Sequence, residues 1–119
     1  TLVCDALSMA LFRRGFPDDV IIHSDKGSQY CSKDYRALIT AYNLKQSMSR
    51  KGNCWDNSVM ERFFRTLKSE HLNVLIFINH QAVISEVENY ITFYNYKRRH
   101  SGLNYLTPHK QYIQMKKVA

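Results

Sequence analysis

The sequence of 119 residues has little of what breaks or cross-links a chain. It contains only 4 glycines, 2 prolines and 3 cysteines, a composition that excludes a collagen-like repeat and a disulfide framework. The cysteines lack C-x-x-C spacing, so no zinc ribbon is indicated. No apolar run is long enough to cross a bilayer, and the start of the sequence does not resemble a signal peptide. We expect one compact cytoplasmic domain without membrane contact.

Acidic residues are fewer than basic ones, and they are unevenly placed. With 17 Lys and Arg against 10 Asp and Glu, the formal net charge is +7. Residues 1–44 are neutral, residues 45–68 carry +4, residues 69–88 carry −3, and residues 89–119 carry +6 without a single acid. Two separate basic stretches favour local contacts with a polyanion over a uniformly basic surface. A solvated helix face explains residues 110–117 equally well.

The spacing of apolar residues predicts alternating helices and strands. Helices are expected at residues 2–11, 32–42, 56–69 and around 83–94, and strands at 20–22 and 44–48. Gly15 is expected to end the first helix and Ser32 to cap the second. The β-branched run at 20–22 is typical of a strand buried on both faces. Two such short strands cannot form a satisfied α/β sheet, so strands are expected to be missing.

Two carboxylates are candidate metal ligands. Asp25 follows the strand at 20–22 at its carboxyl end, where ligands of open α/β sheets bind. Glu61 lies on the polar stripe of its helix, with Arg65 and Lys68 one and two turns further along. A carboxylate so placed can hold a metal ion, and the two cations can hold phosphate oxygens.

Each carboxylate also has a purely structural interpretation. Asp25 can be a turn residue. Glu61 can close a capping box with Ser58, unless Asp56 is the N-cap and leaves Glu61 beyond the first turn. The opposite side of this helix is apolar and is expected to anchor it. Its residues are Val59, Met60, Phe63, Phe64 and Leu67.

Four ordered segments resemble the integrase-type core of bacterial insertion-sequence transposases, in which the second open reading frame encodes a DDE catalytic domain similar to retroviral integrase. The segments are HSDKGSQY (23–30), SMSRKGNCWDN (47–57), ERFFRTLKSE (61–70) and YNYKRRHSGLNYLTP (94–108). The 35 residues between Asp25 and Glu61 match the same group. The resemblance implies a ribonuclease H-like α/β fold, and DNA transposition by phosphodiester hydrolysis and strand transfer.

The resemblance also implies roles for single residues. Asp25 corresponds to the second Asp and Glu61 to the Glu of a triad that holds two divalent ions, Mg²⁺ or Mn²⁺. Lys68 corresponds to a residue that contacts the transposon end. The family's first Asp lies on an earlier strand, and Asp5 falls within a helical pattern, so we do not assign it. We therefore expect an N-terminally truncated core that binds metal weakly and is inactive alone.

Further basic and polar residues are candidate DNA contacts. Besides Arg65 and Lys68 they are Arg50, Lys51, Asn57, Lys97, Arg98 and Arg99. Residues 1–78 are expected to form the partial core and residues 79–119 a helical extension of the same domain. A bacterial, nucleoid-associated homo-oligomer is expected, because an incomplete sheet leaves apolar edges.

Other classes fit the sequence less well. A tyrosine recombinase is disfavoured because no second Arg follows Arg99-His100 at the required spacing, and a zinc module because the His and Cys residues lack paired spacing. The alternative that the sequence leaves open is a non-catalytic fragment with a DNA-binding, assembly or regulatory role.

Overall fold

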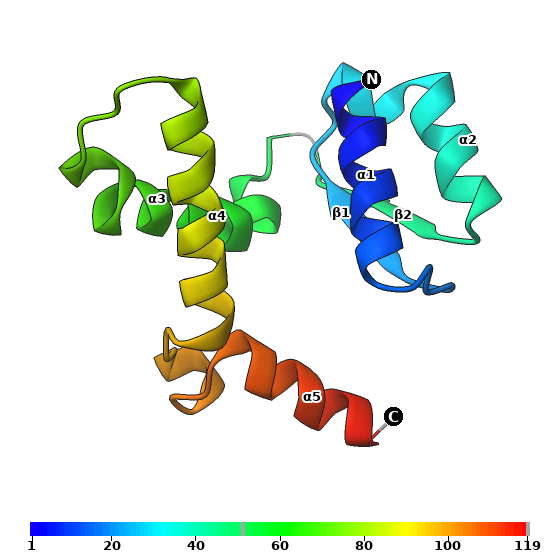
Figure 1. Cartoon of the computed structure of the whole chain (residues 1–119). Coiled ribbons are helices and arrows are strands. Elements are labelled where there is room, and N and C mark those ends of the chain that lie inside the picture. The colour runs from blue at the N-terminus through cyan, green and yellow to red at the C-terminus, as the bar shows by residue number, and fades with distance from the viewer. Residues whose placement is uncertain (51, 119) are drawn as a thin grey trace. The chain divides into compact units, whose positions relative to one another are not determined.

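The computed structural model describes residues 1–50 and 52–118, without the side chain of Cys54. The chain forms two compact units, Thr1–Glu61 and Arg62–Ala119, and each is described by itself (Figure 1). In the described part of the chain, no helix is both long and apolar enough to cross a membrane.

The first unit contains a parallel β-α-β arrangement preceded by a helix. Its elements are α1 (Leu2–Arg13), β1 (Ile21–Ser24), α2 (Lys33–Ala41) and β2 (Lys45–Met48), with 3-10 turns at Ser28–Cys31 and Cys54–Asn57. The two strands pair in parallel, with Ile22 opposite Gln46 and Ser24 opposite Met48. A parallel pair needs a crossover connection, and α2 supplies it.

Local signals place the ends of both helices as the sequence predicts. The first helix ends at Arg13, and Gly15 adopts a φ of +70°, a conformation that glycine reaches without a Cβ penalty. The Ser32 hydroxyl accepts a hydrogen bond of 3.2 Å from the backbone N–H of Tyr35, which caps α2. Both predictions are confirmed.

The core of the first unit lies where α1 and α2 pack together on one face of the sheet. It consists of Leu7, Leu11, Tyr35, Ile39 and Leu44, and Ile22 of β1 packs against it. The neighbouring Ile21 is 65% exposed. The expectation that this strand is buried on both faces is therefore wrong, because only one face of the two-stranded sheet is covered by the described residues.

The second unit is helical. Its elements are the greater part of α3 (Ser58–Glu70), then α4 (His80–Tyr96) and α5 (Pro108–Val118), with 3-10 turns at Leu72–Val74 and Ser101–Leu103. The third helix begins two residues later than predicted, because Cys54–Asn57 forms a 3-10 turn. The last helix lies within the helical extension predicted for residues 79–119, although separate bounds were not predicted for it. Pro108 is its first residue, and the Thr107 hydroxyl accepts a hydrogen bond of 3.3 Å from the backbone N–H of Lys110.

Candidate functional site

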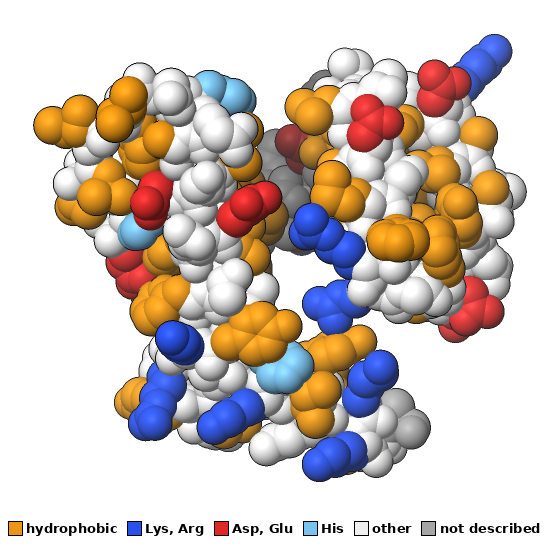
Figure 2. All heavy atoms as spheres, viewed as in Figure 1, with side chains coloured by type: hydrophobic (Ala, Val, Ile, Leu, Met, Phe, Trp, Pro, Cys, Tyr) orange, Lys and Arg blue, Asp and Glu red, His pale blue; other side chains and the backbone are white. Residues whose placement is uncertain are grey.

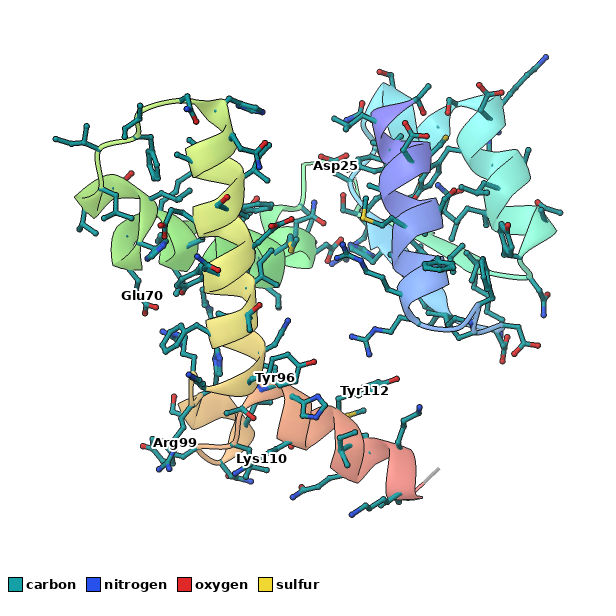
Figure 3. All side chains as sticks on the ribbon, in the orientation of Figure 1. Asp25, Glu70, Tyr96, Arg99, Lys110 and Tyr112 are labelled. Atoms are coloured by element: carbon teal, nitrogen blue, oxygen red, sulfur yellow. The ribbon has the colours of Figure 1, made fainter. Side chains whose placement is uncertain are left out.

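Asp25 directly follows the last residue of β1, in the segment that leaves the strand (Figure 3). Its side chain is exposed, and Oδ1 accepts a hydrogen bond of 2.7 Å from the backbone N–H of Gly27. This bond closes a tight turn and fixes the direction of the carboxylate. The structural and the functional interpretation of Asp25 are therefore compatible, because a turn-forming carboxylate retains a second oxygen.

Gly27 allows this close approach of backbone and carboxylate. A Cβ at this position would lie 2.9 Å from Oδ1 of Asp25 and 2.9 Å from the side-chain amide of Gln29. Its φ of −56° is open to any residue, so the requirement for glycine is one of space. A larger residue here would have to displace the Asp25 carboxylate or the Gln29 side chain.

An open cavity of about 480 Å³ lies beside Asp25 at the carboxyl ends of the two strands. Its lining includes Lys26 from the segment after β1, and Ser49 and Arg50 from the segment after β2. The backbone N–H of Ser49 donates 2.9 Å to the carbonyl of Ser24, which holds the two segments together. One carboxylate and two cations thus border a cavity that is open to solvent.

Arg50 is anchored by Asp56 across the loop that follows β2. Its backbone N–H donates 3.0 Å to Oδ2 of Asp56, and its guanidinium lies 3.4 Å from Oδ1. The hydrogen bonds from the Arg50 backbone and then from its side chain lower the pKa of Asp56. Asp56 is therefore the acceptor for this loop, and the sequence missed that role. Lys51, the neighbouring DNA-contact candidate, lies outside the described residues.

Asn57 also joins this loop. Its side-chain amide donates 3.3 Å to the hydroxyl of Ser49, which is only 6% exposed and lines the cavity beside Asp25. The structure therefore gives Asn57 a definite structural partner, and its predicted contact with DNA stays a prediction.

Glu61 lies in the first turn of α3 and is exposed. Within the described residues its carboxylate makes no hydrogen bond or ion pair, and it forms no capping box with Ser58. Arg65 and Lys68 are exposed further along the same helix. The polar stripe is therefore present as predicted, with its carboxylate available to a ligand.

The apolar side of α3 is less buried than predicted. Leu67 is 6% exposed and Phe63 is partly buried, whereas Val59, Met60 and Phe64 are 81%, 55% and 48% exposed. The expectation that all five residues anchor this helix is correct only for Phe63 and Leu67.

Asp25 and Glu61 belong to the same unit, and both belong to the described residues, where no hydrogen bond or ion pair joins their side chains. Among the described residues, no three His, Cys, Asp or Glu side chains lie close enough together to hold a metal ion. Their assignment as a pair of ligands stays a prediction.

Arg98, the centre of the second basic cluster, is bound to Glu70 at the end of α3. Its Nη2 lies 2.6 Å from Oε1 and its Nε lies 3.0 Å from Oε2, while the Tyr90 hydroxyl donates 2.7 Å to Oε2. The bond from Arg98 is the main reason why the pKa of Glu70 is lowered, and burial together with Glu70 raises the pKa of Tyr90 to about 12. The sequence did not predict this network.

His100 extends the network. A guanidinium can only donate, so Nη1 of Arg98 donates to Nδ1 of His100 over 3.2 Å. Burial lowers the pKa of this imidazole, and its ring packs edge-on against Tyr94 at 4.7 Å. Arg98 is thus committed to the packing of the second unit, while Lys97 and Arg99 on either side of it are exposed.

The class of protein follows from comparison with known sequences. Two sequence profiles of the integrase core domain match the chain, one over residues 42–108 and the other over residues 1–54. The chain therefore belongs to the integrase core domain family, as predicted. That family has a ribonuclease H-like fold, with which the two-stranded sheet and its helices are consistent.

The particular relatives belong to insertion sequences. "Transposase InsF for insertion sequence IS3A" of Escherichia coli (strain K12) is 49% identical over 108 residues, which are 90% of this chain and 38% of that protein. The "Insertion element IS600 uncharacterized 31 kDa protein" of Shigella sonnei is 49% identical over 114 residues, which are 92% of this chain and 42% of that protein. The chain spans less than half the length of these relatives.

Proposed function

We propose that this chain is part of a DNA transposase that catalyses metal-dependent phosphodiester hydrolysis and strand transfer. The observation that carries the proposal is the position of Asp25, at a strand end beside an open cavity with Lys26 and Arg50, in a chain of the integrase core domain family. A carboxylate next to cations suits a divalent ion together with the phosphates of a nucleic acid.

The donor chemistry at Asp25 and Glu61 fits Mg²⁺ or Mn²⁺. Both carboxylates are exposed, and carboxylate oxygens are the ligands that these ions prefer. When bound, a pair of such ions activates the attacking oxygen and stabilises the leaving oxygen in phosphoryl transfer. Two carboxylates are fewer than the three of the family, so we propose that the 119 residues bind metal weakly and do not join DNA alone.

The DNA contacts divide between the two units. In the first unit we assign phosphate contacts to Arg50, which lines the cavity, and to Lys51, its neighbour in sequence. Asn57 supports the loop that carries Arg50. In the second unit we assign phosphate contacts to Arg65 and Lys68 on α3 and to Lys97 and Arg99, since the guanidinium of Arg98 is bound to Glu70.

The exposed apolar surface of the first unit supports an incomplete sheet. Ile21 is 65% exposed on the uncovered face. We propose that further strands of a longer transposase cover this face, and that the whole protein acts as a homo-oligomer. The additional strands would complete the partial core that we predict for residues 1–78, and residues 79–119 would remain its helical extension.

A chimaeric transposase tests the proposal. The chain would replace the matching 108 residues of the E. coli InsF relative, and transposition would be measured in cells. We expect an active chimaera whose activity falls about a thousandfold or more on Asp25→Asn or Glu61→Gln, since metal ligands supply several kcal/mol of transition-state stabilisation.

The matched control is Asp34→Asn, which removes an exposed carboxylate from α2. It should leave transposition unchanged. Retention of activity by Asp25→Asn or Glu61→Gln in the active chimaera would refute the proposal and favour the non-catalytic, DNA-binding alternative.

A further inference from the structure

The end of α4 and the whole of α5 present cations without acids. Residues 89–119 contain six Lys and Arg and no Asp or Glu. Figure 2 shows Lys and Arg side chains gathered over this part of the second unit, with no acidic side chain among them. Five of these cations are exposed, and we call them the C-terminal basic surface: Lys97, Arg99, Lys110, Lys116 and Lys117.

The sixth cation, Arg98, positions this surface. Its guanidinium is held by Glu70 and by His100, and it lies 5.7 Å from the centre of the Tyr94 ring. Because Arg98 is fixed in the packing, the turn after α4 is fixed too, and Lys97 and Arg99 are left exposed on either side. The backbone from which Lys97 and Arg99 project is therefore held in place before any ligand binds.

The last helix carries a cationic groove on one face. His109, Lys110, Ile113, Gln114 and Lys117 line an open cavity of about 300 Å³. These residues recur at helical spacing, so they form one stripe along α5. The two lysines lie about two turns apart on it, and no acid lies between them to neutralise them.

Aromatic rings support the cations of this surface. Nζ of Lys116 lies 5.6 Å from the centre of the Tyr112 ring, and the His109 ring lies 4.6 Å from that of Tyr96 (Figure 3). Each of these two tyrosine rings therefore already has a partner from α5, which leaves less of the ring for stacking with a base. This arrangement favours contact with phosphates over contact with unstacked bases.

The density of charge fits a double helix. The 11 residues of α5 extend over about 16 Å. Duplex DNA carries one phosphate for about every 1.7 Å of its axis, so a helix of this length can meet several phosphates at once. We propose that the C-terminal basic surface binds the phosphate backbone of duplex DNA without reading its sequence. The inference rests on the proposed function and adds a contact on α5 to it.

The test is the salt dependence of binding to a fluorescent duplex of arbitrary sequence, measured by anisotropy on the 119-residue chain in EDTA. The variant carries Lys110→Gln, Lys116→Gln and Lys117→Gln. Each lost phosphate contact lowers the slope of log K against log salt by about 0.9, or about 2.7 for three. Over a fourfold rise in salt, the unaltered chain should then lose about 40-fold more affinity than the variant.

A control of equal charge carries Arg13→Gln, Lys33→Gln and Arg36→Gln, all exposed in the first unit. It should leave the slope unchanged. Equal slopes for variant and control would show an effect of net charge alone and overturn the inference. So would tighter binding to a single strand of the same sequence, or binding to phosphatidylserine vesicles that equals binding to the duplex.

The assay separates this inference from the metal site. EDTA removes divalent ions, and the variant retains Asp25 and Glu61. If the lysine variant binds DNA with an unchanged salt dependence, the prediction for the chimaera still stands. If the chimaera result contradicts the metal site, the salt dependence of DNA binding can still be measured.

Discussion

Glu70→Gln removes the charge that holds Arg98 in the second unit. The glutamine can still accept from the Tyr90 hydroxyl, but the charge-assisted bonds from Arg98 are lost. Such bonds contribute about 1.5–3 kcal/mol when buried and about 0.2–1 kcal/mol when exposed. Glu70 and Arg98 are 39% and 27% exposed, so solvent screening reduces the effect, and we expect a loss of about 1–2 kcal/mol.

Hydrogen exchange measures the loss in the unit concerned. Because the chain has two units, one melting temperature need not report both. The amides of α4 should therefore be followed, where exchange through unit opening accelerates about 5- to 30-fold for this loss of stability. Glu88→Gln is the control, since it removes an exposed carboxylate from α4, the helix whose amides are followed.

The double variant Glu70→Gln/Arg98→Gln isolates the pair. Its loss of stability should be smaller than the sum of the two single losses, because each single change leaves one partner unpaired. The reasoning is refuted if Glu70→Gln accelerates exchange no more than Glu88→Gln, or if the two single losses add.

The pH dependence has a definite sign. The folded-state pKa of Glu70 is lowered, chiefly by its bond from Arg98. Its contribution is therefore present above the ordinary carboxyl pKa and is lost as the pH falls through the lowered value. The stability difference between the unaltered chain and Glu70→Gln should shrink over that acidic range.

Three further predictions follow from single contacts. Gly27→Ala should move the Asp25 carboxylate, because the new Cβ would lie 2.9 Å from Oδ1; NMR shifts of the Asp25 side chain should change while those of α5 do not. Ser32→Ala should destabilise the first unit by about 1 kcal/mol through loss of the cap on α2, and Ser32→Asp should restore most of it, as measured by hydrogen exchange of the α2 amides. Tyr90 has its pKa raised from 10.0 to about 12, so the stability it contributes is present below pH 10 and lost as the pH rises through about 12; ultraviolet titration of Tyr90→Phe should lack one late tyrosine.

Much of the first unit could be predicted from local signals. A β-branched run, the glycine after α1 and the serine before α2 each act within a few residues, so they place β1 and the helix ends to within two residues. The exposure of Ile21 could not be predicted in the same way. It depends on how many strands and helices cover the sheet, which no local pattern contains.

The second unit shows the same limit. The contact between Glu70 and Arg98 spans 28 residues of sequence, and only the packing of helices brings the pair together. A basic cluster in a sequence therefore indicates DNA contacts without distinguishing the cation that is structurally bound. For α5 a signal was present, since Thr107 followed by Pro108 is typical of a helix start.

The sequence predicts which residues form the candidate site, but it does not predict how they are arranged in space. Asp25 lies at a strand end as the sequence indicates, and Glu61 lies exposed on its helix. The anchoring of Arg50 by Asp56 depends on the path of the loop between them. That path brings a predicted DNA contact, Arg50, and one of the two candidate helix caps, Asp56, into one ion pair.

The most direct test of the account is whether one divalent ion is held by Asp25 and Glu61 together. Mn²⁺ would be titrated into the 119-residue chain, and the loss of amide NMR signals by paramagnetic broadening would be mapped. We predict early broadening around both residues, abolished at both places by either Asp25→Asn or Glu61→Gln and preserved in Asp34→Asn. Broadening centred elsewhere, or broadening at Glu61 that survives Asp25→Asn, would contradict the shared metal site.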